Sequence, residues 1–251
     1  IVFDQFLSAA ETKWNQMNSV VVSMPHGYDG NGPEHSSGRI ERFLQGVSED
    51  IETPALSVDE RHHRINWEVT FPSTPAQYFH LIRRHMKRDF RKPWINFFSK
   101  QYLRAPNVST LDDIINGQFQ PIIGDASVPP SKNPHRVVFC TGQMYHLLDR
   151  YRRDHKVDDV AVIRVEQLSP FPVAEMQEVL AQYPKAELMW AQEEPKNMGA
   201  YWHVEPRIEF YTNGERKLLF NGRDVSASPS TGFKYVHEFE QNRILTTAFQ
   251  K

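Results

Sequence analysis

Short apolar segments alternate with turn residues and amphipathic segments along most of the chain. This rhythm of strand, turn and helix predicts an α/β fold with largely parallel sheets. Apolar runs predict strands at residues 20–22, 67–71, 137–140, 160–165 and 188–191, and Pro93 opens another apolar run over residues 94–98. Helical spacing predicts helices at residues 40–44, 145–151, 174–183 and 237–249, and another that begins at Pro75 with Thr74 as its N-cap.

A proline-rich stretch in the middle of the chain predicts a boundary between two domains. Residues 103–134 contain several prolines and little sustained periodicity. We therefore expect one domain over residues 1–103 and a second over residues 104–251. Residues 46–64 are polar and charged, and we expect them to form a segment that lies on the protein surface. The chain opens on Val2-Phe3, a pair typical of a strand, without a methionine, so we expect a piece of a longer protein.

Composition narrows the class of protein. The chain has 251 residues, 39% of them hydrophobic, which is enough for a sizeable core. The 29 basic and 31 acidic residues give a formal net charge of -2, which argues against a general binder of nucleic acid or membrane surfaces. Cys140 is the one cysteine, so an internal disulfide and a cysteine-based zinc cluster are excluded. No apolar run is long enough to span a bilayer.

Candidate chemistry is concentrated in residues 26–37, directly after a predicted strand. The segment contains glycines, which permit close backbone approach to a ligand, together with two histidines, two acids and two serines. Ligands of open parallel sheets bind outside the carboxyl ends of strands, where this segment begins. An ordinary polar turn is the alternative. A calcium loop is poorly supported, because Asp29 and Asn31 are not followed by the required acidic ligands.

Three other polar clusters have open interpretations. His62 and His63 are adjacent with no third ligand nearby, so we expect them to be solvated rather than metal-bound. Residues 192–199 follow a predicted strand and form either a capping loop or an interface patch. The third cluster is either a charged helix face or a phosphate or carboxylate site. Its members are Arg83, Arg84, Lys87, Arg88, Arg91 and Lys92.

Several of these motifs, in the same order, resemble the decarboxylating component of 2-oxoglutarate dehydrogenase, a thiamine diphosphate enzyme family. The resemblance runs from Ile1 almost to Lys251. The matching segments are residues 24–30 (Met-Pro-His-Gly-Tyr-Asp-Gly), 32–37 (Gly-Pro-Glu-His-Ser-Ser), 39–45, 72–76, 83–84, 90–93, 164–172 and 192–199 (Gln-Glu-Glu-Pro-Lys-Asn-Met-Gly).

The resemblance implies the architecture and the activity. Residues 1–103 would be the later part of a transketolase-like pyrimidine-binding domain, and residues 104–251 a transketolase C-terminal-like parallel-sheet domain. The implied reaction decarboxylates 2-oxoglutarate with thiamine diphosphate and passes the succinyl group to the lipoyl arm of a dihydrolipoyl succinyltransferase. A homodimer in the mitochondrial matrix is expected. The diphosphate-binding motif, the activating glutamate and the Mg²⁺ ligands are expected outside this chain, which should be inactive alone.

The resemblance also assigns residues. His35, in the Pro-Glu-His-Ser-Ser motif, is the first choice for catalysis and substrate binding, and His26 is the second, either catalytic or a brace for the loop. Arg84 and Gln167 match an acetyl-CoA effector pocket of some bacterial relatives. Val173 and Ala174 stand where that pocket would have basic residues, which puts effector binding in doubt. No metal ligand is assigned.

Two alternatives stay open at this point. The 2-oxoadipate enzyme shares these motifs, although residues 96–100 and the segment 46–64 favour the eukaryotic 2-oxoglutarate branch. A truncated, non-catalytic module that pairs with complete subunits is the second alternative.

Overall fold

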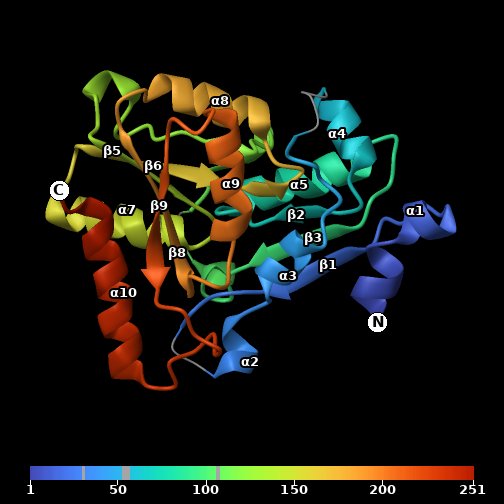
Figure 1. Ribbon diagram of the computed structural model, residues 1–251, viewed down its shortest axis with the longest axis horizontal. Coiled ribbons are helices and arrows are strands. Elements are labelled where there is room, and N and C mark those ends of the chain that lie inside the picture. The colour runs from blue at the N-terminus through green and yellow to red at the C-terminus, as the bar shows by residue number, and fades with distance from the viewer. Residues whose placement is uncertain (30–31, 53–56, 106–107) are drawn as a thin grey trace.

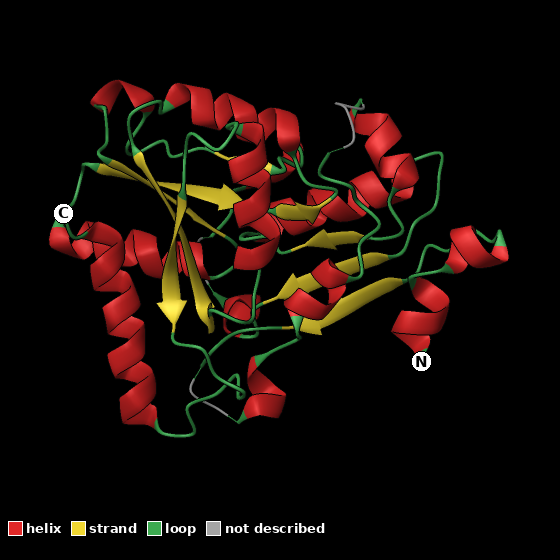
Figure 2. Ribbon diagram, viewed as in Figure 1, coloured by secondary structure: helices red, strands yellow, loops and turns green. Residues whose placement is uncertain are grey.

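The computed structural model describes residues 1–29, 32–52, 57–105 and 108–251. Two sheets lie side by side, with helices packed around them (Figures 1 and 2). The helices are η1 (Val2–Leu7), α1 (Ala10–Trp14), α2 (Pro33–Ser36), α3 (Ile40–Gln45), α4 (Val58–Arg64), α5 (Pro75–Lys87), η2 (Gln101–Arg104), α6 (Leu111–Ile115), η3 (Pro130–Lys132), α7 (Met144–His155), α8 (Val173–Gln182), α9 (Tyr201–Tyr211) and α10 (Lys234–Phe249). The strands are β1 (Val21–Pro25), β2 (Glu68–Thr70), β3 (Trp94–Phe98), β4 (Ile122–Ile123), β5 (Arg136–Cys140), β6 (Val160–Val165), β7 (Gln167–Ser169), β8 (Glu187–Pro195) and β9 (Leu218–Arg223).

The first sheet has the strand order β1-β3-β2-β7. Strands β1, β3 and β2 are parallel, with Val21 opposite Trp94 and Glu68 opposite the same tryptophan on the other side. Strand β7 comes from the second half of the sequence and pairs antiparallel to β2, with Val69 opposite Ser169. The two halves of the chain are therefore joined by backbone hydrogen bonds as well as by side chains.

The second sheet has the order β4-β6-β5-β8-β9, parallel except for the short edge strand β4. Its helices form a layer on each face. Helices α7 and α10 cover one face, where Val138 and Cys140 point, while Val137 and Phe139 of the same strand join the cluster on the opposite face. Both faces of β5 are thus buried, which accounts for its unbroken apolar sequence.

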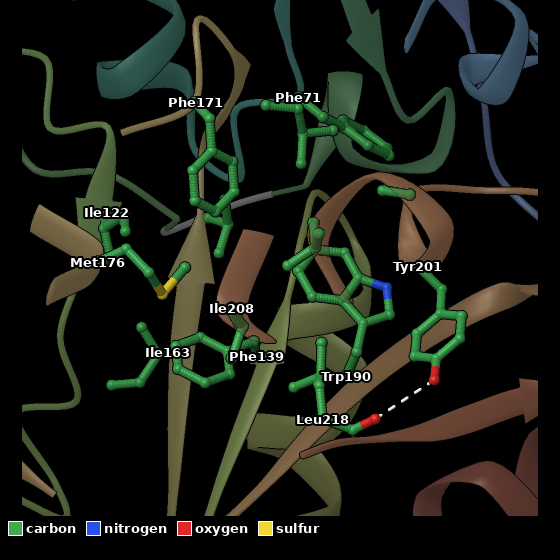
Figure 3. Close-up of a cluster of buried hydrophobic side chains, with 14 of the residues drawn as sticks. Phe71, Ile122, Phe139, Ile163, Phe171, Met176, Trp190, Tyr201, Ile208 and Leu218 are labelled. Carbon is green, nitrogen blue, oxygen red and sulfur yellow. Dashed lines mark hydrogen bonds between the residues drawn. The ribbon is translucent and has the colours of Figure 1, made fainter. Parts of the chain in front are cut away.

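One apolar cluster extends across both sheets. It contains Phe71 and Phe97 from the first sheet and Phe139 and Trp190 from the second. Figure 3 shows how these layers meet, with Phe71 and Phe171 above Trp190 and Phe139. The largest rings in this cluster are almost fully buried, so the two sheets share a core and hold their ends in a fixed relation.

The α/β class and most predicted elements are confirmed, and β6 matches residue for residue. The predicted strand at Val2-Phe3 is wrong, because these residues begin the π-helix η1, where Leu7 is the buried residue. In the predicted helix at Pro75, Tyr78 and Ile82 lie exposed while Leu81 is buried. Within the described residues, no helix combines the length and the apolar character needed to cross a membrane.

For three of the elements that were not predicted, α9, β9 and β7, the reason can be identified. Helix α9 contains Pro206 and buries His203 and Arg207, so its core face does not look apolar. Strand β9 ends in the polar sequence Asn-Gly-Arg. Strand β7 is short and pairs with a strand almost a hundred residues earlier in the sequence, so no local sequence pattern predicts it.

Candidate functional site

The loop after β1 begins at the carboxyl end of a parallel strand. Residues 30 and 31, including the Asn31 considered for calcium, lie outside the described residues. The His26 N–H donates to Phe98 O at 2.8 Å, and the Gly27 N–H donates to Ser36 O at 2.9 Å. The second bond ties the start of the loop to its end and closes it at the base.

His35 lies in α2, on the outer part of this loop. Its side chain is 60% exposed, and Nε2 lies 3.5 Å from Glu34 Oε1. Lys100, just beyond β3, donates from Nζ to His35 O at 3.4 Å. The imidazole is therefore held on a short helix and is open to a ligand that approaches from outside the described chain.

His26 occupies the opposite environment, because its side chain is almost fully buried. Its Nδ1 accepts a hydrogen bond from the Gly38 N–H at 3.2 Å, and its Nε2 lies 2.8 Å from Glu194 Oε1. An Nδ1 that accepts leaves the single ring proton on Nε2, which donates it to Glu194. With both nitrogens occupied and no open face, the geometry supports a brace rather than a proton-transfer group.

Glu193, the neighbour of Glu194 in β8, is linked through Gln143 to the end of another strand. Its Oε2 accepts from Gln143 Nε2 at 2.7 Å, and Gln143 Oε1 accepts from Ser99 Oγ at the end of β3. Burial raises the pKa of Glu193 to about 7, although Arg223 acts in the opposite direction. An irregularity between Ala191 and Pro195 accompanies this pair of consecutive buried carboxylates.

The sequence left residues 192–199 open between a capping loop and an interface patch. Residues 192–195 form the buried end of β8. Glu194 contacts His26 in the first half of the chain, and Glu193 is linked to Ser99 there through Gln143, so the interface interpretation is the correct one. Sequence reasoning missed Gln143 as a contributor to this cluster. The polar end of β8, an otherwise apolar strand, was the signal that could have indicated such a cluster. Gln143 lies 50 positions away from Glu193, so the sequence did not connect the two residues.

A second candidate site is a cavity of about 470 Å³ between the two halves of the chain. It lies among α4, α5 and the start of α8. Its lining includes Arg61, His62, His63, Arg84, Arg88, Gln167, Phe171, Val173, Ala174 and Glu175. The residues that the family resemblance assigned to an effector pocket thus come together here, and so do Val173 and Ala174, the positions that depart from it.

The carboxylate of Glu68 organises the basic side of this cavity. Glu68 is buried in β2, and its Oε1 lies 2.8 Å from His62 Nδ1 and accepts a hydrogen bond from Arg88. The expectation that His62 is solvated is therefore wrong, because a buried carboxylate requires a buried partner. The interpretation as a charged helix face is wrong for Arg88, which turns inward, and for Lys92, which is buried against Glu11.

Arg84 and Gln167 hold buried polar atoms that form no hydrogen bond with the described residues. Arg84 stacks on Phe119, 4.2 Å from the ring centroid, and its Nη2 lies 3.5 Å from Glu68 Oε2. Arg84 Nε and Nη2 and Gln167 Oε1 form no hydrogen bond with any described residue. Burial lowers the pKa of Arg84 to about 9, which leaves the guanidinium charged at neutral pH.

Two family sequence models match the chain. Residues 2–106 match the transketolase pyrimidine binding domain, and residues 108–249 match the 2-oxoglutarate dehydrogenase C-terminal domain. The chain belongs to the 2-oxoglutarate dehydrogenase family. The family membership confirms the resemblance seen in the motifs, whereas the division at residues 103 and 104 stays a prediction.

Relatives from eukaryotes and bacteria resemble this member of the 2-oxoglutarate dehydrogenase family. The chain is 40% identical over 264 residues to the mitochondrial 2-oxoglutarate dehydrogenase of Saccharomyces cerevisiae, an alignment that covers 100% of the chain and 26% of the relative. It is 42% identical over 254 residues to the 2-oxoglutarate dehydrogenase E1 component of Cupriavidus necator, covering 100% of the chain and 25% of the relative. The mitochondrial enzyme of Caenorhabditis elegans is 42% identical over 262 residues, covering 99% and 25%. The chain thus spans about a quarter of the length of these relatives.

Proposed function

We propose that this chain is part of the decarboxylating subunit of a 2-oxoglutarate dehydrogenase and that His35 acts on the substrate there. The observation that carries the proposal is the placement of His35. Its exposed imidazole is held by a closed loop at the carboxyl end of a parallel strand, in a chain of this family. Imidazole groups bind carboxylates and transfer protons in such positions.

The cofactor we propose is thiamine diphosphate with Mg²⁺. Thiamine diphosphate supplies the electron sink for decarboxylation of a 2-oxo acid. The described residues fit the substrate side of such a site, because His35 faces outward with Glu34 as its neighbour. Within the described residues, no group of three or more histidine, cysteine or acidic side chains is placed to hold a metal ion. We therefore propose that the Mg²⁺ ligands belong to another part of the subunit.

The partners follow from the same proposal. The acyl acceptor is the lipoyl arm of a dihydrolipoyl succinyltransferase, and the subunit works as a homodimer. The mitochondrial matrix is the proposed location, which is supported by the names of the yeast and nematode relatives, while the Cupriavidus necator relative is bacterial.

The test uses the full-length subunit with thiamine diphosphate, Mg²⁺ and an artificial electron acceptor. We expect turnover of 2-oxoglutarate, and a loss of about 10²-fold or more in kcat for His35→Ala. His155→Ala is the matched control, because His155 is exposed on α7 and hydrogen-bonds Tyr151 O. Near-normal turnover of His35→Ala would remove His35 from the reaction. A preference for 2-oxoadipate would identify the related enzyme, and no turnover of either acid would favour the non-catalytic module.

The cavity around Arg84 supports a second candidate function, the binding of an anionic effector such as acetyl-CoA. The buried Arg84 guanidinium, whose Nε and Nη2 form no hydrogen bond with the described residues, favours an anion, while Glu175 in the same lining opposes it. Gln167 Oε1 can only accept a hydrogen bond, so it would meet a donor group of the ligand. Calorimetric titration of the full-length subunit with acetyl-CoA should show binding that Arg84→Ala weakens. Equal titrations of wild type and variant would refute this role for Arg84.

A further inference from the structure

The loop that carries His35 is fixed at its base by a carboxylate from the other half of the chain. We propose that Glu194 is a positioning residue for His35: it holds His26 in one tautomer, and His26 in turn holds the loop. Glu194 and His26 lie 168 positions apart in the sequence and meet across the interface between the two sheets. This inference rests on the proposed function, because the loop is the one that presents His35 to the substrate.

The hydrogen bonds around His26 explain how the carboxylate acts. Glu194 Oε1 accepts the Nε2 proton, which leaves Nδ1 free to accept the Gly38 N–H. Gly38 follows the loop directly, so the imidazole bridges the entry and the exit of the loop. Without Glu194, the Nε2 proton is buried with no acceptor, and the imidazole can recover a hydrogen bond only by a shift that breaks its bond to Gly38. Moving the proton to Nδ1 offers no relief. A proton on Nδ1 would face the Gly38 N–H, and two donors cannot share a hydrogen bond.

Packing around the imidazole directs this change toward the loop. The rings of Phe71 and Phe97 lie 5.5 and 5.7 Å from the His26 ring and are nearly perpendicular to it, at 82° and 86°. Both phenylalanines belong to the shared core, which resists displacement. The imidazole is therefore confined on these sides, and a shift of the ring is taken up by movement of the Gly38 backbone and the α2 segment before it.

A second connection from β8 reaches α2 by way of the end of β3. Glu193 accepts from Gln143, which accepts from Ser99 at the end of β3. Lys100 follows Ser99 and donates to His35 O. The two carboxylates thus fix the ends of β1 and β3, the two strands that flank the His35 helix.

Another buried carboxylate provides a control for simple cohesion between the halves. Glu49 Oε2 lies 3.3 Å from Arg207 Nη2, and Glu49 Oε1 accepts from the Phe171 N–H at 2.8 Å. Arg207 and Phe171 lie in the second half of the chain, as Glu194 itself does, but they do not belong to the His35 loop. Glu49→Gln therefore weakens the interface and leaves the loop base intact.

The first experiment measures kcat and KM of the full-length subunit on 2-oxoglutarate. We expect Glu194→Ala to lower kcat by about tenfold to a hundredfold, since a misplacement of about 1 Å costs about that much. Glu194→Gln should stay within about threefold of wild type, because its amide oxygen still accepts the Nε2 proton. Glu49→Gln should leave kcat unchanged. If Glu194→Ala does not fold, Glu194→Asp is measured instead. We expect its kcat to be lower than that of wild type and its melting temperature to be unchanged.

A double variant separates positioning from general stability. If Glu194 acts through His35, then Glu194→Ala adds no further loss of kcat to His35→Ala. Independent, additive losses would overturn the proposal, and so would a kcat of Glu194→Ala or Glu194→Asp equal to that of wild type.

Hydrogen exchange measures the mobility of the loop without relying on turnover, so it tests this inference separately from the proposed function. Peptides that cover residues 26–39 should exchange faster in Glu194→Ala than in wild type, with Glu49→Gln unchanged. A wild-type subunit that turns over no 2-oxo acid would refute the proposed function, while the exchange result would still decide whether Glu194 holds the loop. Unchanged exchange in Glu194→Ala would overturn the inference.

Discussion

The buried carboxyl of Glu193 makes the stability of this protein depend on pH in a defined direction. Burial raises its folded-state pKa from the ordinary 4.5 to about 7. Between these two values the folded protein keeps a proton that the unfolded chain loses, so stability falls as the pH rises through this window. In Glu193→Gln the side chain keeps the shape of the protonated carboxyl but cannot ionise, and its amide oxygen still accepts from Gln143. The variant should therefore lack this loss of stability.

The magnitude follows from the interval between the two pKa values. At about 1.4 kcal/mol per pH unit, the interval from 4.5 to about 7 corresponds to roughly 3 kcal/mol. Glu193→Gln should match wild type near pH 4.5 and exceed it by roughly this amount at pH 7 and above. In a domain of this size, 1 kcal/mol moves the melting temperature by about 2 to 4 °C, so the expected gain is several degrees.

Differential scanning calorimetry of the full-length subunit at pH 5 and at pH 7.5 measures this difference. Glu178→Gln is the control, because Glu178 is exposed on α8 and the change removes the same charge. The melting temperatures of Glu193→Gln and wild type should diverge at pH 7.5 and nearly coincide at pH 5. A gain of equal size at both pH values, or none at pH 7.5, would refute the assignment of a raised pKa to this carboxyl.

Two further predictions concern the second sheet. Phe139→Ala should lower the free energy of unfolding by about 3 to 5 kcal/mol, since the ring is 0% exposed in the shared core, whereas Phe239→Ala, 62% exposed, should cost little; urea denaturation measures both. Cys140 is buried and burial raises the pKa of its thiol, so a thiol reagent should modify it only after unfolding. Rapid modification in the native protein would contradict the burial of β5.

Elements set by their own stretch of sequence could be predicted, whereas features set by contacts between distant residues could not. Strand β6 is a continuous apolar run between turns, and it was predicted to the residue. Helix α9 buries His203, whose Nε2–H donates to Leu168 O, so a core position looks polar in the sequence. His35 and His26 were identified together from one motif, but the sequence offered nothing to separate an exposed imidazole from a buried brace. That difference depends on Glu194, whose contact with His26 arises only when the two sheets pack together.

Both candidate sites depend on contacts between the two sheets. A change in how the sheets pack would therefore affect both sites. At one place Glu194 and Glu193 of β8 fix the strand ends that flank His35. At another, β7 pairs with β2. Gln167 of β7 lines the cavity beside Arg84, and Glu68 of β2 contacts His62 and Arg88 in that lining. A ligand in that cavity can change the His35 loop only if it binds one arrangement of the interface more tightly than another. The same reciprocity requires that substrate binding then alter the affinity of that ligand by an equal factor. The shared core between the sheets is the physical connection through which such an effect would have to pass.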